Sequence, residues 1–260
     1  MAMWTRIKDA IFLSGMAVLP KNLLSRIVGK LVEIKWPAPM ALFLVKGFAK
    51  IFGVKLHEVK EPLESFQSIQ SFFIRELKDG VRFFPDASDV FGSPCDGTWG
   101  MSGRVENGQM LQIKGRPYSL EKLLGGEVVV NGLEGATFST LYLSPKDYHR
   151  FHAPMDMCIQ RAWYLPGYLW PVNEAAVRGV EELFAVNERI VIEVSSPAKP
   201  DAKMWIVAVG ATNVGKIVLG FSDLTSNKPQ RKQEMQEWYE EPILLKKGDY
   251  LGHFCFGSTL

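Results

Sequence analysis

Leu141-Tyr-Leu-Ser-Pro-Lys-Asp-Tyr-His-Arg-Phe-His-Ala-Pro154 is the most informative stretch of this 260-residue chain. It begins inside the apolar run Thr137–Ser144, whose β-branched and aromatic residues are typical of a strand. It then places two histidines three residues apart, His149 and His152, beside acidic, basic and phenolic side chains. The chain has only four histidines, the others being His57 and His253, so half of them fall in this segment. This concentration of polar groups exceeds what a connection between strands needs and indicates a functional site.

The sequence around this stretch has the pattern of a β-rich body. From about residue 80, Gly and Pro separate short runs rich in Val, Ile and aromatic residues, as strands and turns require. These runs are Glu127–Val130, Thr137–Ser144, Arg189–Val194, Trp205–Val209 and Lys216–Leu219. Helical spacing is rare, Ser119–Leu124 being one short example, and no βαβ rhythm or glycine-rich nucleotide loop occurs. We therefore expect an α+β protein in which residues 61–260 form a mostly antiparallel body.

Residues 1–60 have a helical pattern, broken at Pro20 and again at Pro37 and Pro39. In Asn22–Val32, five apolar residues at 3,4 spacing share one helix face. They are Leu23, Leu24, Ile27, Val28 and Leu31. Met40–Val54 is apolar almost all round, apart from Lys46 and Lys50 on one side. Glu61–Lys78 predicts a further helix, whose aromatic stripe would face the core.

The charge of the chain is uneven. Residues 1–60 hold ten Lys or Arg against three acids, a net +7, so the overall +2 leaves −5 for the remaining 200 residues. A basic, apolar segment on a mildly acidic body favours an anionic membrane surface as partner. The alternative is that these helices pack their apolar faces on the rest of the protein.

Composition restricts the other classes of partner and compartment. The small net charge argues against a nucleic-acid binder. Three scattered cysteines, Cys95, Cys158 and Cys255, indicate reduced thiols in a cytosolic setting. No uncharged apolar run reaches about 18 residues, so no spanning helix is expected, and the likeness of the N-terminus to a signal peptide is faint. We expect a peripheral protein on the cytoplasmic side of the cell membrane. The oligomeric state is left open, a homodimer included.

Three separate segments supply the ingredients of an activated hydroxyl nucleophile. Asp96 lies in Gly92-Ser-Pro-Cys-Asp-Gly-Thr98, His152 in the stretch quoted first, and Ser258 in the C-terminal Gly257-Ser258-Thr259. A carboxylate can orient an imidazole that takes the serine proton. Taken alone, Asp96 is typical of a turn residue, and the Gly-Ser-Thr sequence is typical of a loop. The other reading of the two histidines is a metal pair, for which Asp147 or Asp156 would be the third ligand. We expect no metal.

The ordered set of motifs resembles the phosphatidylserine decarboxylase family, of the prokaryotic, pyruvoyl-dependent type. The similarity runs through nearly the whole chain, and the histidine segment, close to Leu-Ser-Pro-x-Asp-Tyr-His-Arg-x-His-x-Pro, is its most specific part. The other matching segments are Ser71–Lys78, Pro94–Gly97, Ile113–Leu120, Leu165–Gly167, Val172–Asn173, Phe184–Arg189, Val209–Gly215 and Phe256–Thr259.

The resemblance implies a proenzyme that cleaves itself between Gly257 and Ser258. Asp96 would hold His152, His152 would deprotonate Ser258, and Ser258 would become the covalent pyruvoyl cofactor that forms a Schiff base with phosphatidylserine. The large subunit would end at Gly257 and the small subunit would begin at Ser258. The expected products are phosphatidylethanolamine and carbon dioxide, as a step of phospholipid biosynthesis. His149 would return a proton to the substrate carbon or position the substrate, and a structural role is its alternative.

Members of the family continue for some tens of residues beyond the serine, so we expect this chain to be truncated at its C-terminus. Two other functions remain open at this point. One is a membrane-binding relative that never processes itself and has no catalytic activity. The other is a Ser-His-Asp lipid hydrolase that keeps Ser258 as an internal nucleophile, although no G-x-S-x-G elbow is present.

Overall fold

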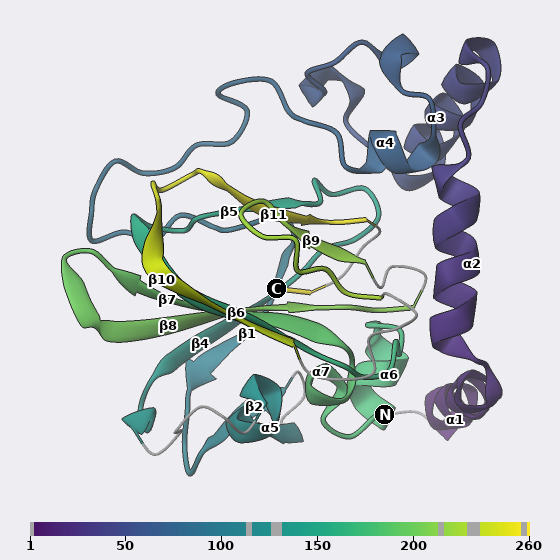
Figure 1. Cartoon of the computed structure of the whole chain (residues 1–260). Coiled ribbons are helices and arrows are strands. Elements are labelled where there is room, and N and C mark those ends of the chain that lie inside the picture. Colours follow the sequence, from purple (N-terminus) through teal and green to yellow (C-terminus); the bar gives the residue numbers. More distant parts are fainter. Residues whose placement is uncertain (1–2, 113–115, 126–131, 213–215, 228–234, 256–258) are drawn as a thin grey trace.

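The computed structural model describes residues 3–112, 116–125, 132–212, 216–227, 235–255 and 259–260. Three helices, α1 (Met3–Val18), α2 (Lys21–Glu33) and α3 (Ala38–Phe52), lie along one side of a body built from sheets (Figure 1). The short helices η1 (Leu56–Glu58), η2 (Leu63–Ser65) and α4 (Ile69–Phe73) connect α3 to that body. Three more short helices follow, α5 (Leu120–Leu124), α6 (Glu174–Gly179) and α7 (Leu183–Val186). The expected α+β class is confirmed.

Every pairing between named strands in the described ranges is antiparallel. The largest sheet has the order β10 (Met235–Leu245), β6 (Met157–Leu165), β7 (Arg189–Ser196), β8 (Lys199–Val209). A second sheet has the order β5 (Arg150–His152), β11 (Tyr250–Phe254), β9 (Ile217–Leu219). Two pairs complete the body: β1 (Thr98–Arg104) with β4 (Thr137–Tyr142), and β2 (Gln109–Gln112) with β3 (Arg116–Ser119).

The main core lies between the four-stranded sheet and the β5-β11-β9 sheet. Residues from β6 and β7, such as Ile159 and Ile192, meet Phe151 of β5 and Phe254 of β11, and all four are fully buried. The rings of Phe151 and Phe254 pack with centroids 5.2 Å apart. Burying side chains of this size stabilises a fold by about 1.5–3 kcal/mol each. Strand β5 ends at His152, so this packing fixes the backbone that carries the two histidines.

The expected helix over Glu61–Lys78 is wrong. The chain forms the short helix η2, passes through an extended Phe66, and starts again as the five-residue α4. Ser68 begins α4 with a capping box, since its hydroxyl accepts from the amide of Ser71 while the Ser71 hydroxyl accepts from the amide of Ser68. Such caps satisfy the free amides of a helix start and therefore favour a break at this point. The aromatic residues are buried as expected, with Phe72 and Phe73 fully enclosed.

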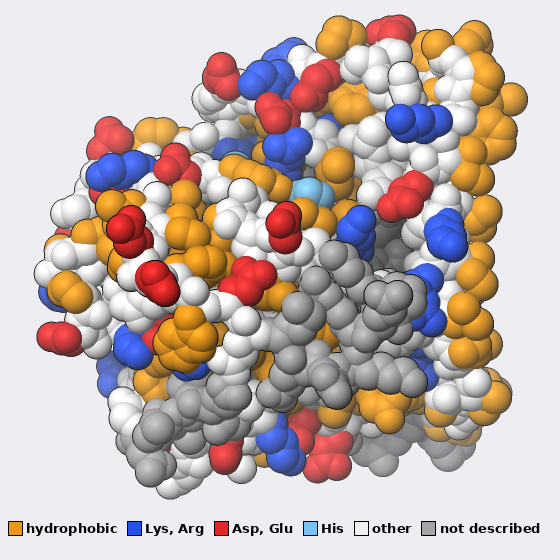
Figure 2. All heavy atoms as spheres, viewed as in Figure 1, with side chains coloured by type: hydrophobic (Ala, Val, Ile, Leu, Met, Phe, Trp, Pro, Cys, Tyr) orange, Lys and Arg blue, Asp and Glu red, His pale blue; other side chains and the backbone are white. Residues whose placement is uncertain are grey.

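Helix α2 presents its apolar side outward. The predicted face includes Leu23, Ile27 and Leu31, whose exposed fractions are 49%, 47% and 58%, whereas the buried residues of α2 are Lys21 and Ser25. Lys21 is held inside by a bond from Nζ to the carbonyl of Met16 (2.7 Å). The alternative that this face packs on the rest of the protein therefore does not hold for these three residues, whereas Leu24 and Val28 of the same face are half-buried. Figure 2 shows hydrophobic side chains along the edge of the molecule where Figure 1 places α1, α2 and α3.

The helical region is joined to the body by specific polar contacts. Arg178 of α6 binds both carboxylate oxygens of Asp9 in α1, at 2.7 and 3.0 Å. Asn22 at the start of α2 donates to the carbonyl oxygen of Gly167 (3.1 Å). These bonds fix the side of the body from which the exposed apolar face projects. Among the described helices, no single one is long and apolar enough to cross a membrane, while the bent pair Ile7–Val18 and Lys21–Glu33 passes that test together.

Candidate active site

The turn before the two histidines is built by Asp147. Its carboxylate accepts from both the backbone amide and the hydroxyl of Ser144, each at 2.7 Å, and its own amide donates to the Ser144 carbonyl. A carboxylate that closes a turn in this way has a structural role. Within the parts of the chain that the structure describes, no three His, Cys, Asp or Glu side chains are grouped to hold a metal ion.

His149 is completely buried and its ring packs on Phe73, with centroids 3.9 Å apart. Its Nδ1 donates to the carbonyl oxygen of Asp147 (2.9 Å), which leaves the lone pair on Nε2. That Nε2 atom has no hydrogen-bond partner among the described residues. Burial lowers the pKa of His149 to about 3, so the ring is neutral near pH 7. A neutral His149 can accept a proton or a hydrogen bond at Nε2, and in this state it has no proton to give from that atom.

His152 lies at the end of β5, half-buried, with both ring nitrogens engaged. Nδ1 donates to the carbonyl oxygen of Gly248 (2.9 Å), and Nε2 accepts from the hydroxyl of Tyr148 (3.2 Å). The rings of Tyr148 and His152 are also stacked, with centroids 5.7 Å apart. Burial is the main cause that lowers the pKa of His152, and Asp96 opposes it weakly through its charge. His152 is therefore neutral near pH 7, with its basic lone pair on Nε2, as a general base requires.

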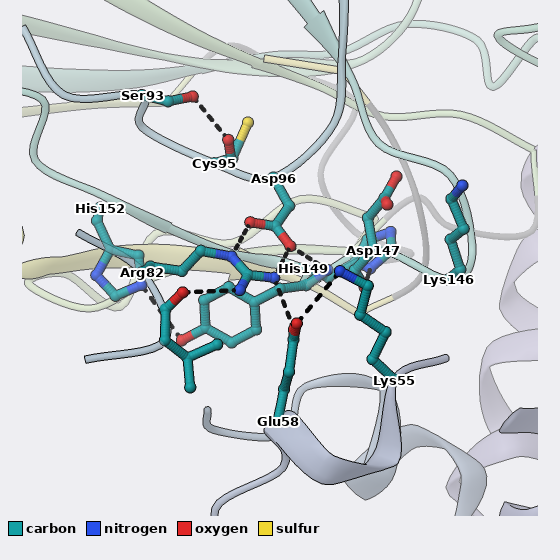
Figure 3. Close-up of polar contacts among 12 residues, drawn as sticks. Lys55, Glu58, Arg82, Ser93, Cys95, Asp96, Lys146, Asp147, His149 and His152 are labelled. Atoms are coloured by element: carbon teal, nitrogen blue, oxygen red, sulfur yellow. Dashed lines mark hydrogen bonds and ion pairs between the residues drawn. The ribbon is translucent and has the colours of Figure 1, made fainter. Parts of the chain in front are cut away.

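Asp96 sits in the loop before β1, where its position depends on Gly97. Gly97 has φ +145°, and a Cβ built on it would lie 2.6 Å from the carbonyl oxygen of Tyr142. Only glycine lets the loop pass this close to the end of β4. Both carboxylate oxygens of Asp96 accept from Arg82, at 2.5 Å each, and one accepts weakly from the amide of Tyr148 (3.4 Å) (Figure 3).

The structure thus brings Asp96, His149 and His152 into one region of the protein (Figure 3). Between the described residues, however, it shows no hydrogen bond from His152 to Asp96. The carboxylate is held by Arg82, and Nδ1 of His152 is held by a backbone carbonyl instead. The expected direct contact between Asp96 and His152 is absent from this state of the protein. The roles of the three residues stay predictions.

Gly257 and Ser258 lie outside the described residues, but the chain on both sides of them is held. Before them, the amide of Phe254 donates to the His149 carbonyl and the amide of Cys255 donates to the Lys216 carbonyl, both at 2.9 Å. After them, the carbonyl oxygen of Thr259 accepts from the amide of Val209 (2.9 Å). One flank of the predicted cleavage bond is therefore joined directly to the segment that carries the two histidines.

Several residues of this site were not predicted from the sequence. Tyr148 lies between Asp147 and His149 in the quoted stretch. Its position in that motif was a signal from which its place in the site could have been predicted. The sequence contains no such signal for Arg82 and Glu58. Neither lies in a recognisable motif, and the two side chains meet only in the folded protein. A further buried acid that the sequence analysis did not single out is Glu188, in the matching segment Phe184–Arg189. Burial raises its pKa to about 8, and Tyr164 donates to it (3.1 Å).

Comparison with known proteins finds relatives that match almost the whole chain. The family model described as phosphatidylserine decarboxylase matches residues 69–260. A phosphatidylserine decarboxylase proenzyme of Anaeromyxobacter sp. (strain K) is 40% identical, with 98% of this chain and 89% of the relative covered. Proenzymes of the same name from Myxococcus xanthus (36%, covering 98% and 89%) and Aliivibrio salmonicida (37%, covering 93% and 84%) are also similar.

Proposed function

This chain belongs to the phosphatidylserine decarboxylase family, and we propose that it decarboxylates phosphatidylserine with a pyruvoyl group made from its own Ser258. The products are phosphatidylethanolamine and carbon dioxide. The observation that carries the proposal is the pair of histidines, one fully buried and one half-buried, on a segment hydrogen-bonded to the strand that leads to residue 258. A non-catalytic membrane protein would not need that strand and the histidines to converge. A serine hydrolase would need His152 beside Ser258 but has no use for the second, fully buried histidine, His149.

The first stage is self-cleavage. His152 Nε2 takes the proton of the Ser258 hydroxyl, and the oxygen attacks the carbonyl carbon of Gly257. The amide bond between the two residues breaks as an ester bond forms in its place. Elimination then breaks the bond between the serine oxygen and its β-carbon, which leaves a carboxylate on Gly257 and dehydroalanine at 258. Water releases ammonia from that residue and leaves the pyruvoyl group. Held geometry of this kind lowers a barrier by up to about 7–11 kcal/mol.

The described residues fit a pyruvoyl group at position 258. Nε2 of His149 is a buried acceptor without a partner among them, and the amide of Phe254 ties β11 to the same residue. A pyruvoyl group supplies a conjugated carbonyl that takes up the electron pair left when carbon dioxide departs. His149 then has two uses: its Nε2 lone pair accepts a hydrogen bond that orients the substrate, and it receives and returns a proton. Its complete burial keeps water from that atom.

Helices α1, α2 and α3 would hold the protein on the cytoplasmic face of the cell membrane, where its lipid substrate lies. The support is the exposed apolar set of these helices and the basic charge of residues 1–60. The exposed apolar set comprises Trp4, Ile7, Ile11, Phe12, Val18, Leu23, Ile27, Leu31, Met40, Phe43, Ile51 and Phe52. A helix with such a face lies in the interface with its lysines among anionic headgroups. The attachment is peripheral.

The decisive experiment is to express the precursor and record its intact mass. Two fragments are expected, the larger ending at Gly257 and the smaller starting with a blocked pyruvoyl group at 258. Ser258→Ala is the matched control and should remain one polypeptide. A wild-type chain that stays uncleaved would overturn the proposal and favour the hydrolase or the non-processing relative instead.

A further inference from the structure

Arg82 lies between two carboxylates that come from distant parts of the chain (Figure 3). Its Nε and one terminal nitrogen donate to the two oxygens of Asp96, at 2.5 Å each. The same terminal nitrogen lies 3.0 Å from Glu58 of η1, the short helix that follows α3. The other terminal nitrogen donates to the carbonyl of Val81 (3.1 Å). The guanidinium thus has its three nitrogens committed, and one of them is shared by both acids.

This arrangement conflicts with the task expected of Asp96. A carboxylate that stabilises the imidazolium of a general base must face the imidazole. Here the carboxylate faces Arg82, and Nδ1 of His152 donates its hydrogen bond to the carbonyl oxygen of Gly248 instead. Asp96 must therefore loosen its contact with Arg82 before it can serve His152 directly.

We propose that Arg82 is a positioning residue for self-cleavage, which holds Asp96 away from His152 in the precursor, and that Glu58 eases the release by competing for the same guanidinium. This inference rests on the proposed self-cleavage at Ser258. Bidentate arginine–carboxylate pairs are the strongest class of charge-assisted hydrogen bond, so the hold is specific. Because Glu58 takes part of the charge of Arg82, the balance between the two acids decides where Asp96 rests.

The charges around His152 decide the expected sign. Its neighbours are Arg150, which opposes protonation, and Asp249 and Asp96, which favour it; Tyr148 and Tyr250 pack on the ring. If Asp96 is freed from Arg82 and binds His152, the imidazolium gains a close counter-charge. An opposite charge at hydrogen-bond distance raises a histidine pKa by one unit or more. His152 then becomes the stronger base, and the pH at which it loses its proton moves upward.

The test is the rate of self-cleavage, followed by intact mass against time over a range of pH. Arg82→Gln should cleave faster than wild type at its plateau, by up to about tenfold, the limit reached when the whole gain of one pKa unit appears in the barrier. The midpoint of its pH–rate profile should move up by roughly one unit. Glu58→Gln should cleave more slowly, because Asp96 then has Arg82 to itself. The double variant should match Arg82→Gln, since Glu58 acts only through Arg82. Arg104→Gln, at an exposed arginine at the end of β1, is the matched control.

The outcomes separate this inference from the proposed function. If wild type never cleaves, both fail together. If wild type cleaves and Arg82→Gln is equal or slower with an unmoved pH midpoint, only the role of Arg82 is overturned. If Arg82→Gln cleaves slowly and also has a lowered melting temperature, the rate of Glu58→Gln decides the question. Cleavage of Glu58→Gln at the wild-type rate would reject the competition between the two acids.

Discussion

The backbone amide of Phe254 donates to the carbonyl oxygen of His149 at 2.9 Å, so strand β11 runs directly against the histidine segment. Strands β11 and β5 are antiparallel partners, in which His253 pairs with Arg150 and Gly252 with Phe151. Ser258 follows Phe254 by four residues in the sequence. The strand that leads to the predicted cleavage bond is therefore positioned by the same ladder that positions His152.

The two histidines should separate cleavage from decarboxylation. His152→Ala removes the base for Ser258 and should slow self-cleavage by about 10²–10⁴-fold, the usual contribution of a general base. His149→Ala should still cleave but decarboxylate phosphatidylserine poorly, because the buried acceptor at Nε2 is lost. Intact mass reports the first property, and release of carbon dioxide from phosphatidylserine reports the second. Normal decarboxylation by processed His149→Ala would show that the residue is only structural.

Gly97→Ala should lower stability and slow self-cleavage together. The new Cβ would lie 2.6 Å from the Tyr142 carbonyl oxygen, and φ +145° disfavours any side chain, so about 1–3 kcal/mol of unfolding free energy should be lost. Asp96, one residue earlier, would move with the loop. Gly108→Ala is the control: φ +69° also disfavours a side chain, but nothing lies within 4 Å of its Cβ. Denaturant unfolding and cleavage kinetics compare the two variants, and equal losses would argue against the close contact at Gly97.

His149 should make the protein less stable as pH falls. Its folded pKa is lowered to about 3 by burial, whereas an unfolded histidine takes up its proton near pH 6.5. The stability is thus present above about 6.5 and is lost as pH drops towards 3, because only the unfolded chain binds the proton in that window. At pH 5 the loss is about 2 kcal/mol by this linkage. His149→Gln should flatten the fall in melting temperature between pH 7 and 4.5, while His57→Gln, at an exposed position, should keep the wild-type fall.

The outward face of α2 should carry part of the membrane affinity. Replacing Leu23, Ile27 and Leu31 by serine removes three half-exposed apolar side chains, each worth about 1.5–3 kcal/mol if fully buried. Binding to vesicles that contain anionic lipid should weaken by more than tenfold, with little change in melting temperature, because these residues are not in the core. Leu244→Ser, at a comparably exposed leucine on β10, should bind as wild type does. Equal binding by both variants would place the membrane contact elsewhere.

Local patterns predicted the elements well where the pattern and the environment agree. The helix expected over Asn22–Val32 corresponds to α2, and the strand expected over Arg189–Val194 lies within β7. The helix expected over Glu61–Lys78 fails because Ser68 offers a cap in the middle of a continuous apolar stripe. Spacing alone does not distinguish one long helix from two short ones that bury the same aromatic residues.

By itself, the sequence determined the family and the antiparallel α+β character and predicted which residues would react, because side-chain chemistry and short-range periodicity follow from the order of residues. Only the tertiary structure decided which atoms those groups face. It pairs Asp96 with Arg82 and directs the Nδ1 hydrogen bond of His152 to the carbonyl oxygen of Gly248. It also exposes Leu23, Ile27 and Leu31 of α2. Each of these depends on contacts between segments far apart in the chain, where burial and competition among charges choose the partner, and no local pattern encodes that choice.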